Sequence, residues 1–187
     1  MANSGYAGAM RMATVGVTDI DQALTLFRDI MELKVEREGD LPGSLLAAWG
    51  LGDGTSAKFA ELSCKGYPVG WLRLVQYSPQ ATDKVRLDFG SDNADSGTDV
   101  GPKALDFYVA DPIAPYVEKI EQAGYKFRSH PVKHQIGTTV SEECLFSGPD
   151  GVPVLIMVGH VHKSPSMRAG APDGPFSEIP TISVVAG

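Results

Sequence analysis

The sequence predicts an α+β fold built from two modules, each with the element order β-α-β-β-β. Two observations support this prediction. Residues 17–33 continue a β-type apolar run into a short helix that starts at an acidic residue, and a second strand follows. Residues 104–127 repeat this strand–helix–strand order more loosely, and strand-like segments follow both stretches.

The first module is expected over residues 10–77, after an N-terminal tail of residues 1–9. Its first strand, residues 10–17, alternates in hydrophobicity, and Asp19 is the predicted N-cap of the helix because its carboxylate can accept the first free amides. The apolar stripe of this helix contains Ile20, Ala23, Leu24, Phe27 and either Ile30 or Met31. The remaining elements are a strand over 33–38, a short helix or turn over 44–49, strands over 56–64 and 69–77, and a hairpin turn over 65–68.

An acidic, Gly- and Ser-containing linker is expected over residues 78–102. Its most acidic part, residues 91–99, invites comparison with a calcium loop, which needs Asp or Asn at alternating positions and a final Glu. Ala94 occupies one of those positions, so a solvated linker is the favoured interpretation.

The second module is expected over residues 103–160. Its helix is predicted to start with Asp111 as cap and Pro112 at the first helical position, and to end at Gly124. The other elements are strands over 104–110, 125–130, 138–146 and 152–158, a loop over 131–137 and a turn over 148–151. Residues 161–187 are predicted to be a linker followed by an extra strand from Ile179, either the start of a further module or a C-terminal edge strand.

Composition and charge limit the possible functions of the chain. The 187 residues are 43% hydrophobic with a formal net charge of −7, so the sequence lacks the basic footprint of a nucleic-acid-binding protein. No apolar run approaches the length needed to span a membrane, and the N-terminus does not resemble a signal peptide. Cys64 and Cys144 follow no metal or redox spacing, which predicts free thiols in a cytoplasmic protein.

The stretch from Asp19 to Leu33 resembles the helix signature of the vicinal oxygen chelate superfamily, which includes glyoxalases, bleomycin-resistance proteins and extradiol dioxygenases. Glu32 stands where that pattern usually has glycine. Residues 148–151, Gly-Pro-Asp-Gly, resemble the Asp-Pro-Asp-Gly turn before the last strand of the family, with Gly148 in place of the first Asp. The resemblance implies that the two modules form a curved mixed sheet that encloses a cleft.

The resemblance also implies a divalent metal held by His, Glu or Gln from the first and last strands of both modules. The corresponding positions here are Met12, Arg73, Ala104 and Leu155, and a shift of one residue offers no ligand either. We therefore predict no metal and no other cofactor. Of the four histidines, His130, His134, His160 and His162, the last two can share a strand face and hold a metal with a carboxylate, but surface histidines are the favoured interpretation.

Without its metal, the predicted cleft is mainly apolar and suits an organic ligand. The candidate ligand-binding residues are Met12, Trp71, Arg73, Ala104, Asp106, Tyr108, Leu155 and Met157. Arg73 and Asp106 can pair across the cleft as a plug, or Arg73 can anchor a carboxylate or carbonyl oxygen. Glu142 or Glu143, depending on register, is a candidate base or a solvated strand residue, and Cys144 is expected to be a buried apolar residue.

These observations predict a small-molecule-binding protein of the glyoxalase and bleomycin-resistance type, without the metal, that binds an aromatic or carbonyl compound. The alternative is an enzyme of the same superfamily, a lyase, isomerase or ring-cleavage dioxygenase, either metal-independent or with its metal site in a missing C-terminal half. The expected assembly is a homodimer or part of a longer tandem chain. No catalytic residue is assigned, and no nucleic-acid or membrane partner is expected.

Overall fold

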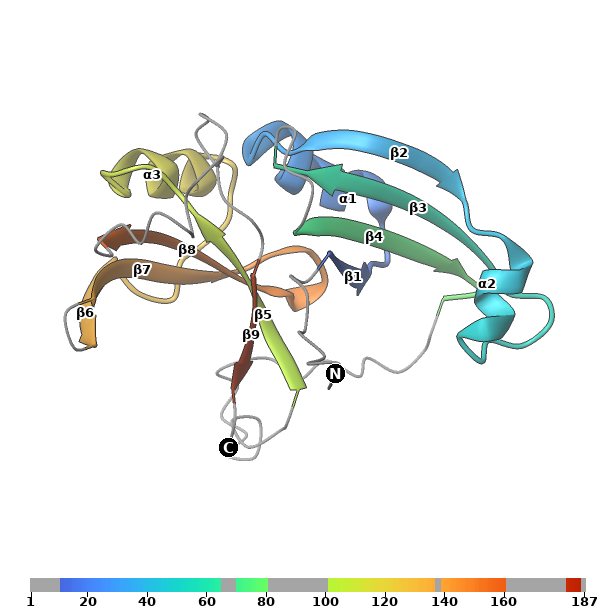
Figure 1. The fold of residues 1–187 in the computed structure, drawn as a ribbon. Coiled ribbons are helices and arrows are strands. Elements are labelled where there is room, and N and C mark those ends of the chain that lie inside the picture. The colour runs from blue at the N-terminus through green and yellow to red at the C-terminus, as the bar shows by residue number, and fades with distance from the viewer. Residues whose placement is uncertain (1–10, 65–69, 81–100, 137–138, 161–180, 186–187) are drawn as a thin grey trace, which may run out of the picture.

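The computed structural model describes residues 11–64, 70–80, 101–136, 139–160 and 181–185. These residues form two open mixed sheets, with strand orders β1-β4-β3-β2 and β6-β7-β8-β5-β9 (Figure 1). In each sheet the first strand of its module pairs in parallel with the last, and the remaining pairs within the module are antiparallel. The predicted α+β architecture of two βαβββ modules is therefore confirmed.

The first sheet is built as the sequence predicts. Its elements are β1 (Met12–Gly16), α1 (Ile20–Leu24), a π-helical turn (Thr25–Ile30), β2 (Lys34–Asp40), α2 (Gly43–Ala48), β3 (Ser56–Ser63) and β4 (Trp71–Ser78). Asp19 caps α1 as expected, because its side chain accepts hydrogen bonds from the backbone amides of Asp21 and Gln22. The π-helical turn was not predicted, and within it Leu26 and Phe27 are both buried.

The second sheet departs from the prediction at two places. Its elements are β5 (Gly101–Tyr108), α3 (Ala114–Gln122), β6 (Val132–Ile136), β7 (Thr139–Ser147), a 3-10 turn (Pro149–Gly151), β8 (Pro153–His160) and β9 (Thr181–Val185). The predicted strand over residues 125–130 is wrong apart from a single antiparallel bridge between Phe127 and Phe146, and the strand beside β7 is β6, inside the predicted loop. Tyr125 and Phe127 instead pack their rings against Phe146, with centroid distances of 5.6 and 5.0 Å.

The predicted start of the second helix is also wrong. Asp111 is not its N-cap, because α3 begins at Ala114 after Ile113 and has Pro115 in its first turn. Proline is tolerated there because the first-turn amides have no helical partner. The start of α3 thus coincides with Pro115 in the first turn and not with Asp111.

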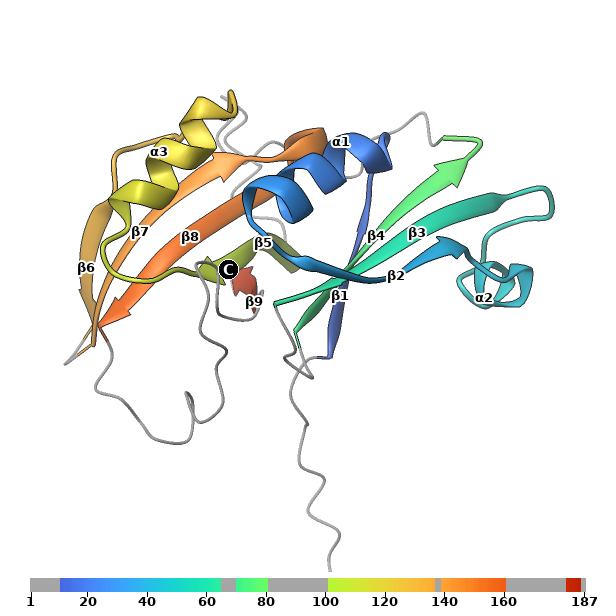
Figure 2. The ribbon, with the colours of Figure 1, turned by 90° about the horizontal axis from the view of Figure 1, so that it is seen from above.

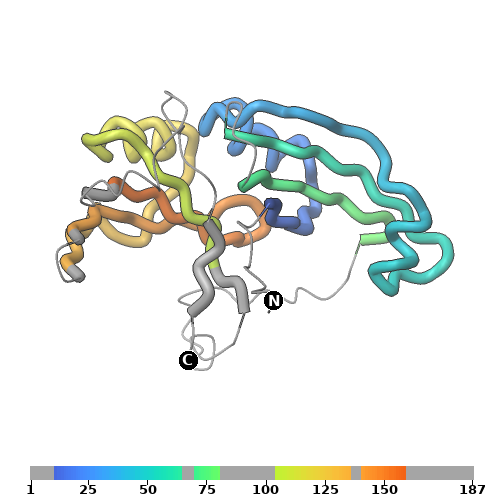
Figure 3. Tube along the Cα trace, in the orientation of Figure 1, coloured from blue at the N-terminus to red at the C-terminus, as the bar shows by residue number. Residues whose placement is uncertain are grey.

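One hydrophobic core joins the two modules. Figures 2 and 3 show the two modules side by side, with α1 lying near the second sheet, and the Phe27 ring lies 6.1 Å from the Phe107 ring of β5. At the module boundary the backbone amide and hydroxyl of Thr18 donate to Asp150 at 2.8 and 2.6 Å. Lys119 of α3 reaches Glu32 at 2.7 Å.

The structure shows the local backbone and packing at the two positions where the sequence departs from the family pattern. Glu32, which stands at the usual glycine, has a φ of 61°, so this position does require a left-handed backbone. A side chain at Gly148 would begin 3.1 Å from a Val154 methyl and 3.3 Å from a Leu26 methyl, so the aspartate of the family pattern would require these neighbours to shift.

The extra strand predicted near the C-terminus is present as β9, which pairs antiparallel with β5 at the edge of the second sheet. The predicted hairpin turn over 65–68, the acidic segment 91–99 and His162 lie outside the described residues. Among the helices that are described, none is long and apolar enough to cross a membrane.

Candidate functional site

Each sheet has one face packed on the shared core and one face turned away from it, here called the open face. Along β4, Leu72 and Leu74 are fully buried in the core, so Trp71 and Arg73 point to the open face. The same alternation places all eight predicted ligand-binding residues on open faces. Met12, Trp71 and Arg73 lie on the first sheet, and Ala104, Asp106, Tyr108, Leu155 and Met157 lie on the second.

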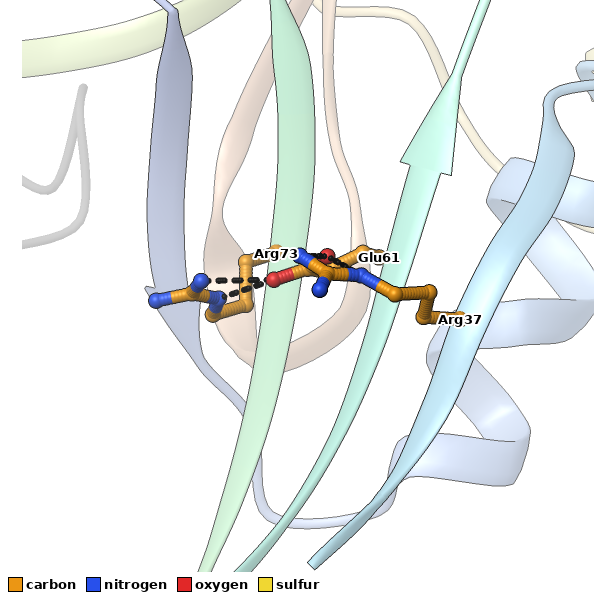
Figure 4. A network of polar contacts seen from close by, with 3 residues as sticks. All are labelled: Arg37, Glu61 and Arg73. Carbon is orange, nitrogen blue, oxygen red and sulfur yellow. Dashed lines mark hydrogen bonds and ion pairs between the residues drawn. The ribbon is translucent and has the colours of Figure 1, made fainter. Parts of the chain in front are cut away.

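A polar row crosses the open face of the first sheet. Thr14, Arg73, Glu61 and Arg37 are register partners on the adjacent strands β1, β4, β3 and β2. The Glu61 side chain is 1% exposed and lies between the two arginines (Figure 4). One carboxylate oxygen accepts from Arg73 Nε and Nη2 at 2.8 and 2.6 Å, and the other accepts from Arg37 Nε at 2.7 Å. We call Arg37, Glu61 and Arg73 the arginine–glutamate row.

This arrangement gives Arg73 a different partner from the predicted one. Arg73 pairs with Glu61 on its own sheet, so the predicted pairing with Asp106 of β5 is wrong. Asp106 is instead the register partner of Leu155, and Leu155 is the partner of Leu145. The equivalent row of the second sheet therefore contains Thr181, Asp106, Leu155 and Leu145, and its positions on β8 and β7 are apolar.

A β-bulge explains how Arg37 reaches Glu61. The pairing of β2 with β3 shifts by one residue at Glu36, so Glu36 and Arg37 both point to the open face although they are consecutive. Glu36 accepts a hydrogen bond from the Ser63 hydroxyl at 2.7 Å and pairs with Lys34 at 2.8 Å. These contacts lower the pKa of Glu36, with Lys34 contributing most, and keep it ionised.

The four positions implied for the superfamily's metal do not offer a suitable donor set. A thioether, a guanidinium, a methyl and an isobutyl group stand at Met12, Arg73, Ala104 and Leu155, and the Arg73 guanidinium carries positive charge. In the part of the chain that the structure describes, no group of three or more His, Cys, Asp or Glu residues could hold a metal ion. The residues present therefore do not fit the superfamily's divalent metal.

The remaining candidates divide between the two faces of the second sheet. Glu143 is the register partner of Met157 and lies 3.5 Å from His134, so it is the glutamate on the open face, whereas Glu142 pairs with buried Val158. Cys144 lies in the core as predicted, and burial raises the pKa of its thiol to about 12. This thiol stays protonated and is a poor nucleophile at neutral pH.

Sequence reasoning missed Glu61 and Arg37. Glu61 is an acidic residue inside the apolar run 59–62, and such a residue needs a charged partner if it is buried. That signal was available, but its partners depend on the β3–β4 register and on the bulge at Glu36.

No protein-family model and no curated protein matches the sequence. Solved structures do match the fold. A glyoxalase family protein from Bacillus cereus aligns with a TM-score of 0.68 at 17% identity, over 85% of this chain and 99% of that chain. A glyoxalase/dioxygenase from Nostoc punctiforme aligns with a TM-score of 0.54 at 18% identity, over 84% and 98% of the two chains.

A glyoxalase family protein from Enterococcus faecalis has a TM-score of 0.54 at 13% identity, over 79% of this chain and 95% of that chain. The chain therefore has the fold of the vicinal oxygen chelate superfamily, as the sequence resemblance predicts. Many chemistries share this fold, so the function of this chain depends on the residues of its open faces and not on the fold.

Proposed function

We propose that this chain is a small-molecule-binding protein that takes an organic ligand, aromatic or carbonyl-bearing, on its open faces without the superfamily's metal. The observation that carries the proposal is the replacement at the four metal positions. Three of the four side chains are apolar, and the fourth, Arg73, is held by Glu61 in a fixed orientation.

Apolar and aromatic side chains surround these positions and supply the contact area that an organic ligand needs. On the first sheet, Met12 and Trp71 are register partners next to Arg73. On the second sheet, Tyr108 and Met157 are register partners next to Leu155. All four side chains are partly exposed, so a ligand can reach them.

Metal analysis combined with ligand screening tests the proposal. The purified protein is expected to contain substoichiometric Fe, Mn, Ni and Zn, and to bind aromatic or carbonyl fragments equally well before and after treatment with EDTA. Line broadening and chemical-shift changes in the ligand and protein spectra report that binding. Stoichiometric metal whose removal abolishes fragment binding would overturn the proposal.

A second candidate is an enzyme of the same superfamily. Glu143 and His134, 3.5 Å apart on the second sheet, are the observation that favours it, since a carboxylate beside an imidazole can act as a general base. A reaction whose rate is unchanged in Glu143→Gln would exclude this role for the pair.

A further inference from the structure

The arginine–glutamate row carries more positive than negative charge. Glu61 contributes one carboxylate, and Arg37 and Arg73 contribute two guanidiniums, so the row has one net positive charge. Among the described residues of this face, a further ion pair, Lys34 with Glu36, is balanced. A protein with a formal net charge of −7 thus presents a local cationic site on the open face of its first sheet.

Both arginines keep donors for a second anion. Each uses its Nε and Nη2 edge on Glu61, and within the described residues neither guanidinium donates to any other group. The opposite end of the Arg73 guanidinium points away from Glu61 (Figure 4). A planar guanidinium can bind one carboxylate along each of two edges, so these ends remain suited to a second carboxylate.

Glu61 prepares both side chains for such a ligand. A free arginine side chain loses rotamer freedom when it binds, and this loss weakens affinity. Here the buried carboxylate already fixes both guanidiniums, while Arg73 remains 20% exposed and Arg37 64% exposed. The row is ordered by a buried group and open to an incoming anion.

The surroundings of the row indicate where the body of the ligand lies. Next to the row on one side, Val75 and Phe59 are covered by a small apolar cluster around α2 that contains Leu41 and Leu46. On the other side, Trp71 and Met12 are partly exposed register partners. Among the described residues that adjoin the row, Trp71 and Met12 therefore offer the partly exposed apolar surface on which an aromatic body can pack.

We propose that the arginine–glutamate row binds the carboxylate of an aromatic organic anion, with its ring over Trp71 and Met12. This inference rests on the proposed function and names the class of ligand for the same face. Glu61 is a positioning residue in this site, and Arg37 and Arg73 contact the ligand.

Benzoate and its neutral isostere benzamide test the ligand class. Each is titrated into the full chain at low salt, where electrostatic binding is least screened, and followed by the arginine Nε–Hε and tryptophan indole signals in ¹H–¹⁵N spectra. Fragments of this size bind in the millimolar range, so titrations extend to tens of millimolar. Benzoate is expected to bind about tenfold or more tightly than benzamide, the difference expected for one charge-assisted hydrogen bond.

Arg37→Gln is the informative variant because Arg37 is mostly exposed and its loss leaves the Glu61–Arg73 pair intact. It is expected to weaken benzoate binding about tenfold and to leave benzamide unchanged. The matched control is Arg28→Gln, since Arg28 is an exposed arginine paired with Asp29 in the π-helical turn that follows α1. The control should bind benzoate like the wild type.

The outcomes separate this inference from the proposed function. Equal binding of benzoate and benzamide to the wild type, or equal weakening of benzoate in the Arg28 and Arg37 variants, would overturn the anion site and leave the binding function standing. If neither these probes nor any neutral aromatic or carbonyl fragment binds, the proposed function fails together with the inference.

Discussion

Replacing Glu61 by glutamine measures how strongly the central carboxylate stabilises the arginine–glutamate row. Glutamine keeps the shape of the side chain, but it carries no charge and turns an N–H toward one guanidinium. Breaking a buried ion pair costs about 3–5 kcal/mol, and because Arg73 is 20% exposed we expect about 3 kcal/mol from its loss of a partner. Arg37, which is 64% exposed, adds about 1 kcal/mol at most.

Urea unfolding followed by tryptophan fluorescence measures the loss in free energy of unfolding. A double-mutant cycle with Arg73→Met then gives the coupling energy between Glu61 and Arg73. Because Arg73→Met removes the partly buried cation, adding Glu61→Gln to it should cost much less stability than Glu61→Gln alone. We expect a coupling of about 2 kcal/mol or more. Asp29→Asn, which breaks an exposed ion pair, is the control and should leave the urea midpoint unchanged. A coupling below about 0.5 kcal/mol would refute the argument that Glu61 and Arg73 depend on each other.

Three further predictions concern backbone strain, packing and thiol chemistry. Glu32→Gly should be about 1 kcal/mol more stable than Glu32→Ala in urea unfolding, because only glycine adopts the φ of 61° without cost; equal stabilities would contradict this. Gly148→Asp should lower the free energy of unfolding by about 1–3 kcal/mol, because a Cβ there lies 3.1 Å from Val154; an unchanged midpoint would show that the site relaxes. Burial raises the pKa of Cys64 to about 11 and of Cys144 to about 12, so iodoacetamide should label both thiols in urea and neither in the folded protein. Above pH 9, the ordinary thiol pKa, the unfolded chain loses thiol protons that the folded chain keeps, so the free energy of unfolding should fall as the pH rises. A free energy of unfolding that does not change with alkaline pH would count against the raised pKa values.

Most of the fold could be predicted from the sequence because local patterns determine it. Asp19 offers its carboxylate to the first amides of the helix whatever surrounds it, and alternation along β1 and β4 identifies the core face directly. The failures lie where tertiary packing overrides a local signal. Tyr125 and Phe127 have strand-like spacing, but their rings pack on Phe146 and only Phe127 forms a bridge to β7, so no strand develops there.

The candidate site was only half predictable. Arg73 could be identified from its position in β4, because that position is defined relative to a recognisable motif. Its partner could not, because simple alternation from Val35 places Arg37 on the core face, and the bulge at Glu36 reverses this assignment. Asp106 was the predicted partner because strand alternation places it on a face expected to line a common cleft with Arg73, whereas strand register within the first sheet places Glu61 beside Arg73.

The core shared by the two modules has a consequence for cooperativity. Phe27 and Phe107 belong to different modules but to the same core, and Thr18 and Asp150 join the modules at their boundary. Neither module can unfold alone without exposing the apolar surface of the other, so the chain loses its structure as one unit rather than in halves. A substitution in the core of the second sheet therefore changes the fraction of molecules in which the arginine–glutamate row of the first sheet is assembled.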